Sequence, residues 1–241
     1  MVTLLIVEHR KDTANRDKRD RETYYCGRSN KRRDDSMYKL YGRPGSGSFA
    51  VQIALEETGA AYERIWVGTE ASDVAIFRAT NPTGRVPALM LPDGTVMFES
   101  AAMLIHLALS HPKAALAPQS GTNRHAAFLQ WMVFLSANIY EAVLRVYYSG
   151  RYSTRGESDA EVIREQATAD FCNYLALISQ GLGPYVLGGS YSSADPYLYM
   201  LAGWYPGNKT ELFGRLPKLE AHAKIMAARP AVAKVEADHA Q

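Results

Sequence analysis

The sequence predicts a small α/β domain followed by an all-α domain. A strand, helix and strand pattern over residues 38–66 is typical of a right-handed βαβ unit with parallel strands. A hairpin pattern followed by an apolar helix then covers residues 88–110. Beyond residue 122 the apolar residues recur at helical spacing, which predicts helices.

Composition excludes several classes of protein. The 241 residues are 47% hydrophobic and 22% charged, with a formal net charge of +2, which is ordinary for a globular protein and rules out wholesale disorder. Two cysteines, Cys26 and Cys172, cannot form a disulfide framework or a four-thiolate zinc site. We therefore expect reduced thiols, a cytoplasmic location and no metal. No stretch approaches the roughly 18 consecutive apolar residues of a membrane span, so we expect no membrane partner.

Residues 1–36 differ from the rest of the chain. They contain ten Lys or Arg and seven Asp or Glu, a balance of +3, and lack helical or alternating apolar periodicity after Glu8. This pattern favours a disordered or spurious extension, with the folded chain beginning at Met37. The run Lys31-Arg32-Arg33 could bind nucleic acid, but it is short and is followed by two aspartates, so we expect no nucleic-acid partner.

The first half reads as alternating strands and helices. Residues 38–41 form a short apolar strand, and a loop rich in glycine and serine follows over 42–48. Residues 49–58 have a helical apolar face and end at Gly59, a residue suited to a helix C-terminus. Residues 62–66 alternate as a second strand.

The next segment predicts a hairpin and a helix. Residues 88–91 and 95–98 flank a Pro-Asp-Gly sequence, which is typical of a turn between antiparallel strands. Glu99-Ser100 then open an apolar helix over 101–110. Residues 111–122 contain two prolines and a glycine and are expected to be a linker.

The second half predicts helices throughout. Residues 123–148 carry a long apolar stripe, and Ser192 to Asp195 form a capping box before another apolar segment. We expect further helices over 158–180, 217–228 and 230–237.

Taken in order, these elements resemble the glutathione transferase family. The resemblance rests on Val86-Pro87 before the third strand, Glu99-Ser100 before the third helix, and a capping box in an all-helical second half. It implies a thioredoxin-like, glutathione-binding domain at 37–111 and an all-helical C-terminal domain at 122–241. It also implies a homodimer that uses glutathione as co-substrate.

Val86 and Pro87 are expected to present backbone groups to a peptide. If the bond between them is cis, the N–H and C=O of Val86 turn outward and offer two antiparallel hydrogen bonds to the cysteine of glutathione. A cis X–Pro bond costs only about 0.5–1 kcal/mol relative to trans. A trans proline would merely begin an edge strand; the flanking motifs favour the cis form.

Glu99 and Ser100 are expected to bind the other end of the ligand. At a helix N-terminus, side chains and free N–H groups converge on one place and favour an anion. The resemblance implies that Ser100 receives the γ-glutamyl carboxylate and that Glu99 meets the α-amino group. An ordinary helix cap uses the same geometry.

The thiol-activating residue is expected in the loop after the first strand. Bacterial relatives with the pattern Pro-Gly-Ala-Cys-Ser have a catalytic cysteine where this chain has Gly47. The resemblance therefore implies a serine-type mechanism, in which Ser46 or Ser48 donates a hydrogen bond to the glutathione thiolate. Ser48 could instead cap the first helix, and Tyr41 or backbone N–H groups alone are the remaining candidates.

Other residues complete the predicted site. Arg85 could contact a glutathione carboxylate, and the resemblance places Tyr140, Tyr147 and Tyr148 beside the electrophile. Cys172 lies on an apolar helical face and is expected to be buried and inert.

The predicted reaction is conjugation of the glutathione thiolate to a small hydrophobic electrophile, as in detoxification. The alternatives are a glutathione-dependent isomerase or dehalogenase on the same scaffold, or a non-catalytic binding or assembly protein.

Overall fold

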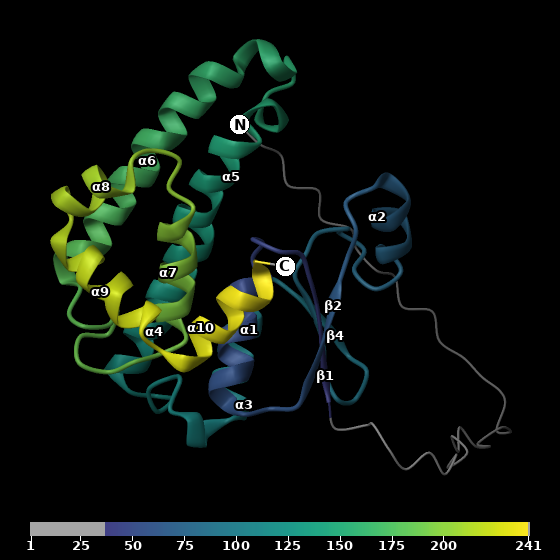
Figure 1. Ribbon diagram of the computed structural model, residues 1–241, viewed down its shortest axis with the longest axis vertical. Coiled ribbons are helices and arrows are strands. Elements are labelled where there is room, and N and C mark those ends of the chain that lie inside the picture. Colours follow the sequence, from purple (N-terminus) through teal and green to yellow (C-terminus); the bar gives the residue numbers. More distant parts are fainter. Residues whose placement is uncertain (1–36, 241) are drawn as a thin grey trace, which may run out of the picture. The chain divides into compact units, whose positions relative to one another are not determined.

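The computed structural model describes residues 37–240. It consists of a four-stranded sheet with helices on both faces, followed by helices alone (Figure 1). This confirms the predicted fold class. Residues 1–36, predicted to be a disordered or spurious extension, lie outside the described residues.

The sheet has the strand order β2-β1-β3-β4. The pair β1 and β2 is parallel, as predicted, and the other two pairs are antiparallel. Leu40 in the central strand β1 is fully buried and pairs with Arg64 of β2. The strand bounds are β1 (Tyr38–Gly42), β2 (Tyr62–Trp66), β3 (Ala88–Met90) and β4 (Val96–Phe98).

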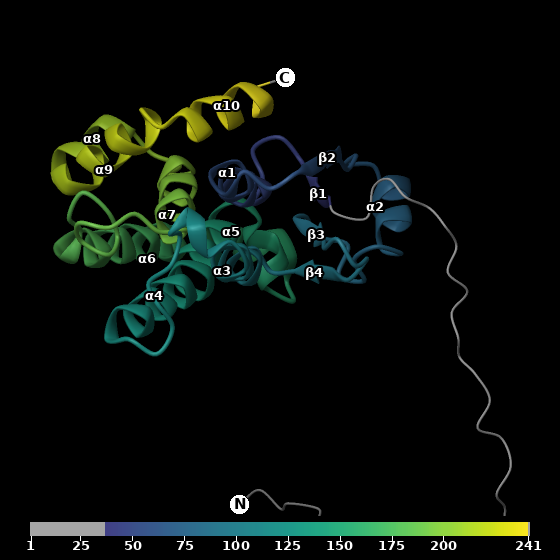
Figure 2. The same ribbon diagram turned by 90° about the horizontal axis from the view of Figure 1, so that it is seen from below.

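Three helices cover the sheet. Helices α1 (Ser48–Thr58) and α3 (Ser100–Ser110) contact each other on one face, and α2 (Ala71–Phe77) lies on the other (Figures 1 and 2). As predicted, α1 ends at Gly59, whose φ of 65° a side chain rarely permits. The sequence pattern did not predict α2, because a seven-residue helix with a single fully buried side chain leaves little apolar periodicity.

The long predicted helix at 123–148 is divided. It consists of α4 (Asn123–Phe134), a π-helical turn (Leu135–Tyr140) and α5 (Glu141–Tyr147). Within the described chain, this stretch is long and apolar enough to cross a membrane by length and composition, with a mean hydropathy of 1.3. One of its faces supplies fully buried residues to the hydrophobic core.

The remaining helices pack in sequence: α6 runs along α5, α7 contacts the π-helical turn, and α8 packs on α9. Helix α7 is almost completely buried, and α10 packs along α1 (Figure 2). The sequence did not predict α8, which buries only Leu212. Their bounds are α6 (Ala160–Gly181), α7 (Ala194–Gly203), α8 (Lys209–Arg215), α9 (Pro217–Ala227) and α10 (Pro230–His239).

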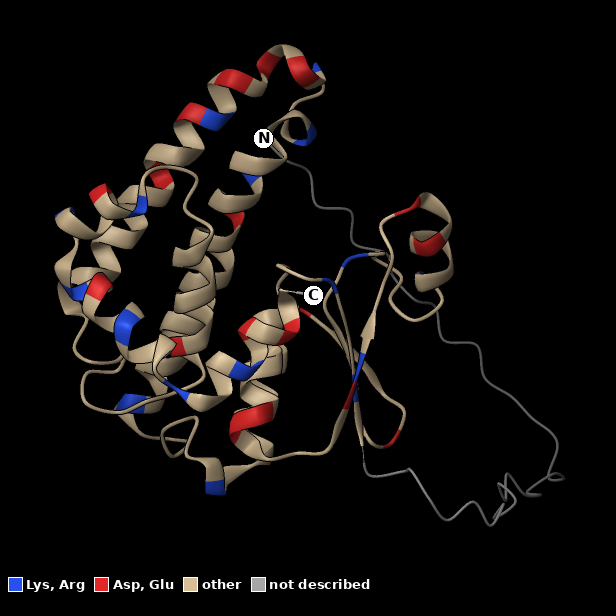
Figure 3. Ribbon diagram, viewed as in Figure 1, with Lys and Arg blue, Asp and Glu red and all other residues tan. Residues whose placement is uncertain are grey.

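Ion pairs hold α10 against α1. Arg229, at the start of α10, forms an ion pair with Glu57 at 2.7 Å, and Lys234 pairs with Glu56 at 2.7 Å. The opposite charges lie on neighbouring ribbons of α1 and α10 (Figure 3). The C-terminal helix is thereby held against the helix that follows the candidate catalytic loop.

Candidate active site

In the loop between β1 and α1, the serine hydroxyls form hydrogen bonds with other groups of the same loop. Ser46 Oγ accepts from the backbone N–H of Arg43 at 3.1 Å and donates to its carbonyl at 2.8 Å. Ser48 Oγ lies 2.9 Å from Ser46 Oγ and 3.3 Å from the Arg43 carbonyl. A hydroxyl carries one proton, so these bonds commit both protons to the loop. The donor role of Ser46 or Ser48 toward a thiol stays a prediction.

Ser48 does not cap the first helix. The N-cap is Gly47, which has no side chain, and Ser48 is the first helical residue, fully buried. Tyr41 lies at the other side of the sheet from Leu40, with its ring 5.7 Å from that of Phe77 in α2. Contact of Tyr41 with glutathione is likewise a prediction.

The peptide bond between Val86 and Pro87 is cis, as the flanking motifs predicted. The loop before it is organised by Asn81, which is 1% exposed. Its amide donates to the carbonyl of Arg85 at 2.7 Å and accepts from the N–H and hydroxyl of Thr83. Sequence reasoning did not single out Asn81, although the Asn-Pro-Thr-Gly sequence is typical of such a side-chain-supported turn. The side chain of Arg85 is exposed.

Glu99 and Ser100 stand at the amino end of α3, where the sequence predicts them. Glu99 adopts φ 75°, ψ 103°, a conformation that non-glycine residues rarely take and that is most common at functional sites. Ser100 is 6% exposed, and its Oγ lies 2.9 Å from Tyr197 Oη of α7. Burial raises the pKa of Tyr197 to about 12. No sequence signal connected Tyr197 with Ser100, because 97 residues separate them.

Of the three tyrosines predicted beside the electrophile, Tyr140 lies closest to the catalytic loop. A Cβ atom placed on Gly47 would lie 2.8 Å from Tyr140 Oη and 3.1 Å from Pro87 Cδ. Tyr147 and Tyr148, at the end of α5, are about half exposed. Tyr147 donates to the carbonyl of Trp204 at 2.9 Å.

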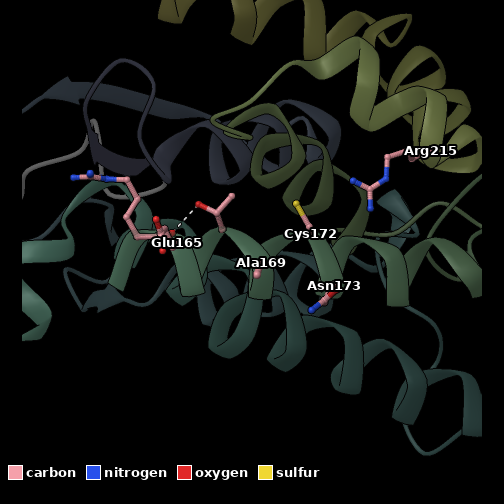
Figure 4. Close-up of a pocket in the computed structure, with 7 residues that line it drawn as sticks. Glu165, Ala169, Cys172, Asn173 and Arg215 are labelled. Carbon is pink, nitrogen blue, oxygen red and sulfur yellow. Dashed lines mark hydrogen bonds between the residues drawn. The ribbon is translucent and has the colours of Figure 1, made fainter. Parts of the chain in front are cut away.

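Two hollows lie outside these predicted residues. One, of about 610 Å³, is bordered by α1, α7, α8, α9 and α10 and includes Phe49 and Trp204 in its wall. The other, of about 590 Å³, lies along α6 and is lined by Arg164, Cys172, Arg215 and their neighbours (Figure 4). Cys172 is partly exposed there, so the expectation that it is buried was wrong. Residues 37–240 contain no cluster of three side chains able to hold a metal.

His239 joins the C-terminal helix to the catalytic loop. Its Nδ1 accepts from the N–H of Gly45 at 3.1 Å, and its Nε2 donates to Gln52 Oε1 at 3.1 Å. The imidazole meets the rings of Phe49 and Trp66 edge-on, at centroid distances of 5.1 and 5.0 Å. This contact joins residues 194 positions apart and was not predicted from the sequence.

This contact makes stability depend on pH. Burial, and then the nearby Arg64, lower the pKa of His239 from 6.5 to about 4. Below pH 6.5 the unfolded chain binds a proton that the folded chain does not, so we expect stability to fall as the pH drops from 6.5 toward 4. The partly exposed imidazole should contribute about 1–2 kcal/mol to this loss.

Urea unfolding of the parent and of His239→Gln at about pH 7.5 and about pH 4.5 measures this effect. The variant has no imidazole at this site, so its stability should decline less between the two conditions. Equal declines in the two proteins would refute this role of His239.

Family models for two domains match this chain. The model described as "Glutathione S-transferase, N-terminal domain" matches residues 48–109, and the one described as "Glutathione S-transferase, C-terminal domain" matches residues 137–239. The glutathione S-transferase GstA of Escherichia coli O157:H7 is 28% identical over 80% of this chain and 94% of its own length.

Solved structures agree with these matches. A glutathione transferase homologue from Sulfitobacter, solved with bound glutathione, is 31% identical, with a TM-score of 0.76 over 84% of this chain and 98% of its own. A sphingomonad glutathione S-transferase complexed with glutathione is 29% identical, with a TM-score of 0.69 over the same shares of each chain. The chain therefore belongs to the glutathione S-transferase family.

Proposed function

We propose that this protein is a glutathione transferase that conjugates the thiolate of glutathione to small hydrophobic electrophiles. The observation that carries the proposal is that cis-Pro87 packs against Gly47, the residue at the amino end of α1. Relatives that resemble this chain over more than four-fifths of its length bind glutathione in their solved structures.

Each end of glutathione has a proposed partner. The N–H and C=O of Val86 pair with the backbone of the ligand's cysteine, as the cis bond to Pro87 permits. The amino end of α3 favours the γ-glutamyl carboxylate at Ser100, and Glu99 binds the α-amino group. Arg85, which is exposed before Val86, is the proposed partner of another carboxylate of the ligand.

The proposed chemistry begins with the thiol. A free cysteine thiol has a pKa of about 8.5 and is mostly protonated at neutral pH. The amino end of α1 carries a partial positive charge, which favours the thiolate. The thiolate then forms a bond to the electrophilic carbon as the bond from that carbon to its leaving group, such as chloride, breaks. Tyr147 and Tyr148 offer apolar surface for that second substrate.

Product analysis tests the proposed reaction. We expect the parent protein to form a glutathione adduct with a chlorinated aromatic substrate, consuming glutathione and releasing chloride in equal amounts. Glutathione that returns unspent while the second substrate is changed would favour an isomerase. Saturable glutathione binding without turnover of a panel of electrophiles would favour a non-catalytic binding protein, and either result would contradict conjugation.

We further propose a cytoplasmic homodimer with a role in detoxification. The exposed side chains Leu129 and Val133 lie four residues apart on one face of α4, and Val133 is 61% exposed. Apolar residues so placed suit burial against a second copy of the chain. Sedimentation velocity measures the assembly directly: a mass of one chain at micromolar concentration would contradict the dimer.

A further inference from the structure

We propose that the hydroxyl of Tyr140, from the helical half of the chain, is the catalytic donor that hydrogen-bonds the sulfur of bound glutathione. This inference rests on the proposed function and changes the identity of the activating residue. It replaces the predicted donors Ser46 and Ser48 in that role.

The position of Tyr140 follows from the space above Gly47. A Cβ atom on Gly47 would lie 2.8 Å from Tyr140 Oη and 3.5 Å from the ring carbon Cε2. Gly47 has φ −57°, which any residue adopts, so its backbone conformation does not require glycine. The missing side chain instead leaves room for the phenol directly at the amino end of α1.

The serine hydroxyls are hydrogen-bonded within the loop. Ser46 Oγ donates to the Arg43 carbonyl, and Ser48 Oγ is fully buried between Ser46 and that same carbonyl. The hydrogen bonds that hold the loop would have to break before either serine could donate to a ligand. Tyr140 has no such competing bond among the hydrogen bonds of the described residues.

The surroundings of Tyr140 restrict the orientation of its ring and keep its hydroxyl protonated. The ring meets Trp204 edge-on at 5.4 Å and Tyr197 at 6.2 Å, which restricts its rotation. Burial, followed by the neighbouring Tyr197, Tyr148 and Glu99, raises the pKa of Tyr140 above its ordinary value. The phenol therefore keeps its proton at neutral pH and acts as a donor, while the thiol proton passes to water.

The test measures the pKa of the bound thiol from the ultraviolet absorbance of its thiolate. In Tyr140→Phe, which keeps the ring and loses the hydroxyl, we expect that pKa to rise by about 1, which is a tenfold decrease in the acid dissociation constant of the bound thiol. The dissociation constant of S-methylglutathione, which has no thiol proton, should change less than about threefold. Tyr191→Phe is the matched control, because Tyr191 is a partly buried tyrosine, like Tyr140, and its hydroxyl donates to Glu57 at the opposite end of α1.

A second variant tests the geometry. Gly47→Ala places a methyl group against Tyr140 Oη, so we expect it to raise the thiol pKa as Tyr140→Phe does. In the double variant the two effects should not add, because the hydroxyl that the methyl displaces is already gone.

The outcomes separate the inference from the proposed function. Glutathione bound by Tyr140→Phe with an unchanged thiol pKa overturns the role of Tyr140 and leaves the proposed function standing. A rise in that pKa in Ser46→Ala or Ser48→Ala, with none in Tyr140→Phe, assigns the role to a serine. Absence of glutathione binding in the parent, measured by calorimetry, overturns both.

Discussion

Replacing Asp195 by alanine is expected to lower the free energy of unfolding by about 3–5 kcal/mol. The carboxylate is completely buried at the start of α7. Its Oδ1 accepts from the N–H of Val186 at 2.7 Å and contacts His222 Nε2 at 3.1 Å, and its Oδ2 accepts from the N–H of Ser192 at 2.7 Å. Alanine would leave these buried donors without an acceptor. A buried donor without a partner costs its full desolvation free energy, which makes this substitution strongly destabilising.

Urea unfolding followed by circular dichroism measures this loss. Asp195→Asn, which keeps the shape and one acceptor oxygen, should cost less than Asp195→Ala. Glu165→Ala, an exposed substitution on α6, should change the free energy of unfolding by no more than about 0.5 kcal/mol. A loss below about 1 kcal/mol in Asp195→Ala would contradict the importance of this network.

Replacing Glu99 by glutamine is expected to weaken glutathione binding about 10- to 100-fold. Hydrogen bonds to charged groups contribute about 1.5–3 kcal/mol, and the substitution removes the charge that is proposed to meet the α-amino group. Calorimetric titration gives the dissociation constant. Glu63→Gln, on an exposed acidic residue of β2 that pairs with Lys39, is the matched control and should bind as the parent does.

The backbone at Glu99 gives this prediction a second readout. Because its φ is 75°, Glu99→Gly should relieve strain, so the free energy of unfolding should stay the same or rise by up to about 1 kcal/mol while binding is lost. A loss of stability together with binding would mean that Glu99 supports the fold rather than the ligand. Unchanged affinity in both variants would remove Glu99 from the site.

The sequence predicted those parts of the fold that depend on local chemistry. Gly59 ends α1 because glycine readily adopts the positive φ found there, and the Pro-Asp-Gly turn joins β3 to β4 because these residue types favour turn conformations. The π-helical turn at Leu135–Tyr140 was not predictable, since the apolar stripe that runs through it keeps an α-helical spacing. Short helices such as α8 bury too few residues to produce a period.

The same distinction applies to the site. The start of α3 at Ser100 follows from neighbouring residues, whereas the cis bond at Pro87 was predicted from the flanking motifs that carry the family resemblance. The direction of the Ser46 hydroxyl, by contrast, depends on the carbonyl it meets once the loop has closed. The hydrogen bonds between Ser100 and Tyr197 and between Gly45 and His239 join segments that are far apart in the sequence. A single sequence carries no signal for such pairs.

The most direct test is a crystal structure of the full chain with glutathione bound. We predict that the ligand's cysteine pairs with the backbone of Val86 and that its γ-glutamyl group lies at Glu99 and Ser100. Its sulfur should lie at the amino end of α1, within hydrogen-bond distance of Tyr140 Oη. Glutathione found instead in the hollow beside Phe49 and Trp204, or with its sulfur directed away from α1, would contradict the proposed site.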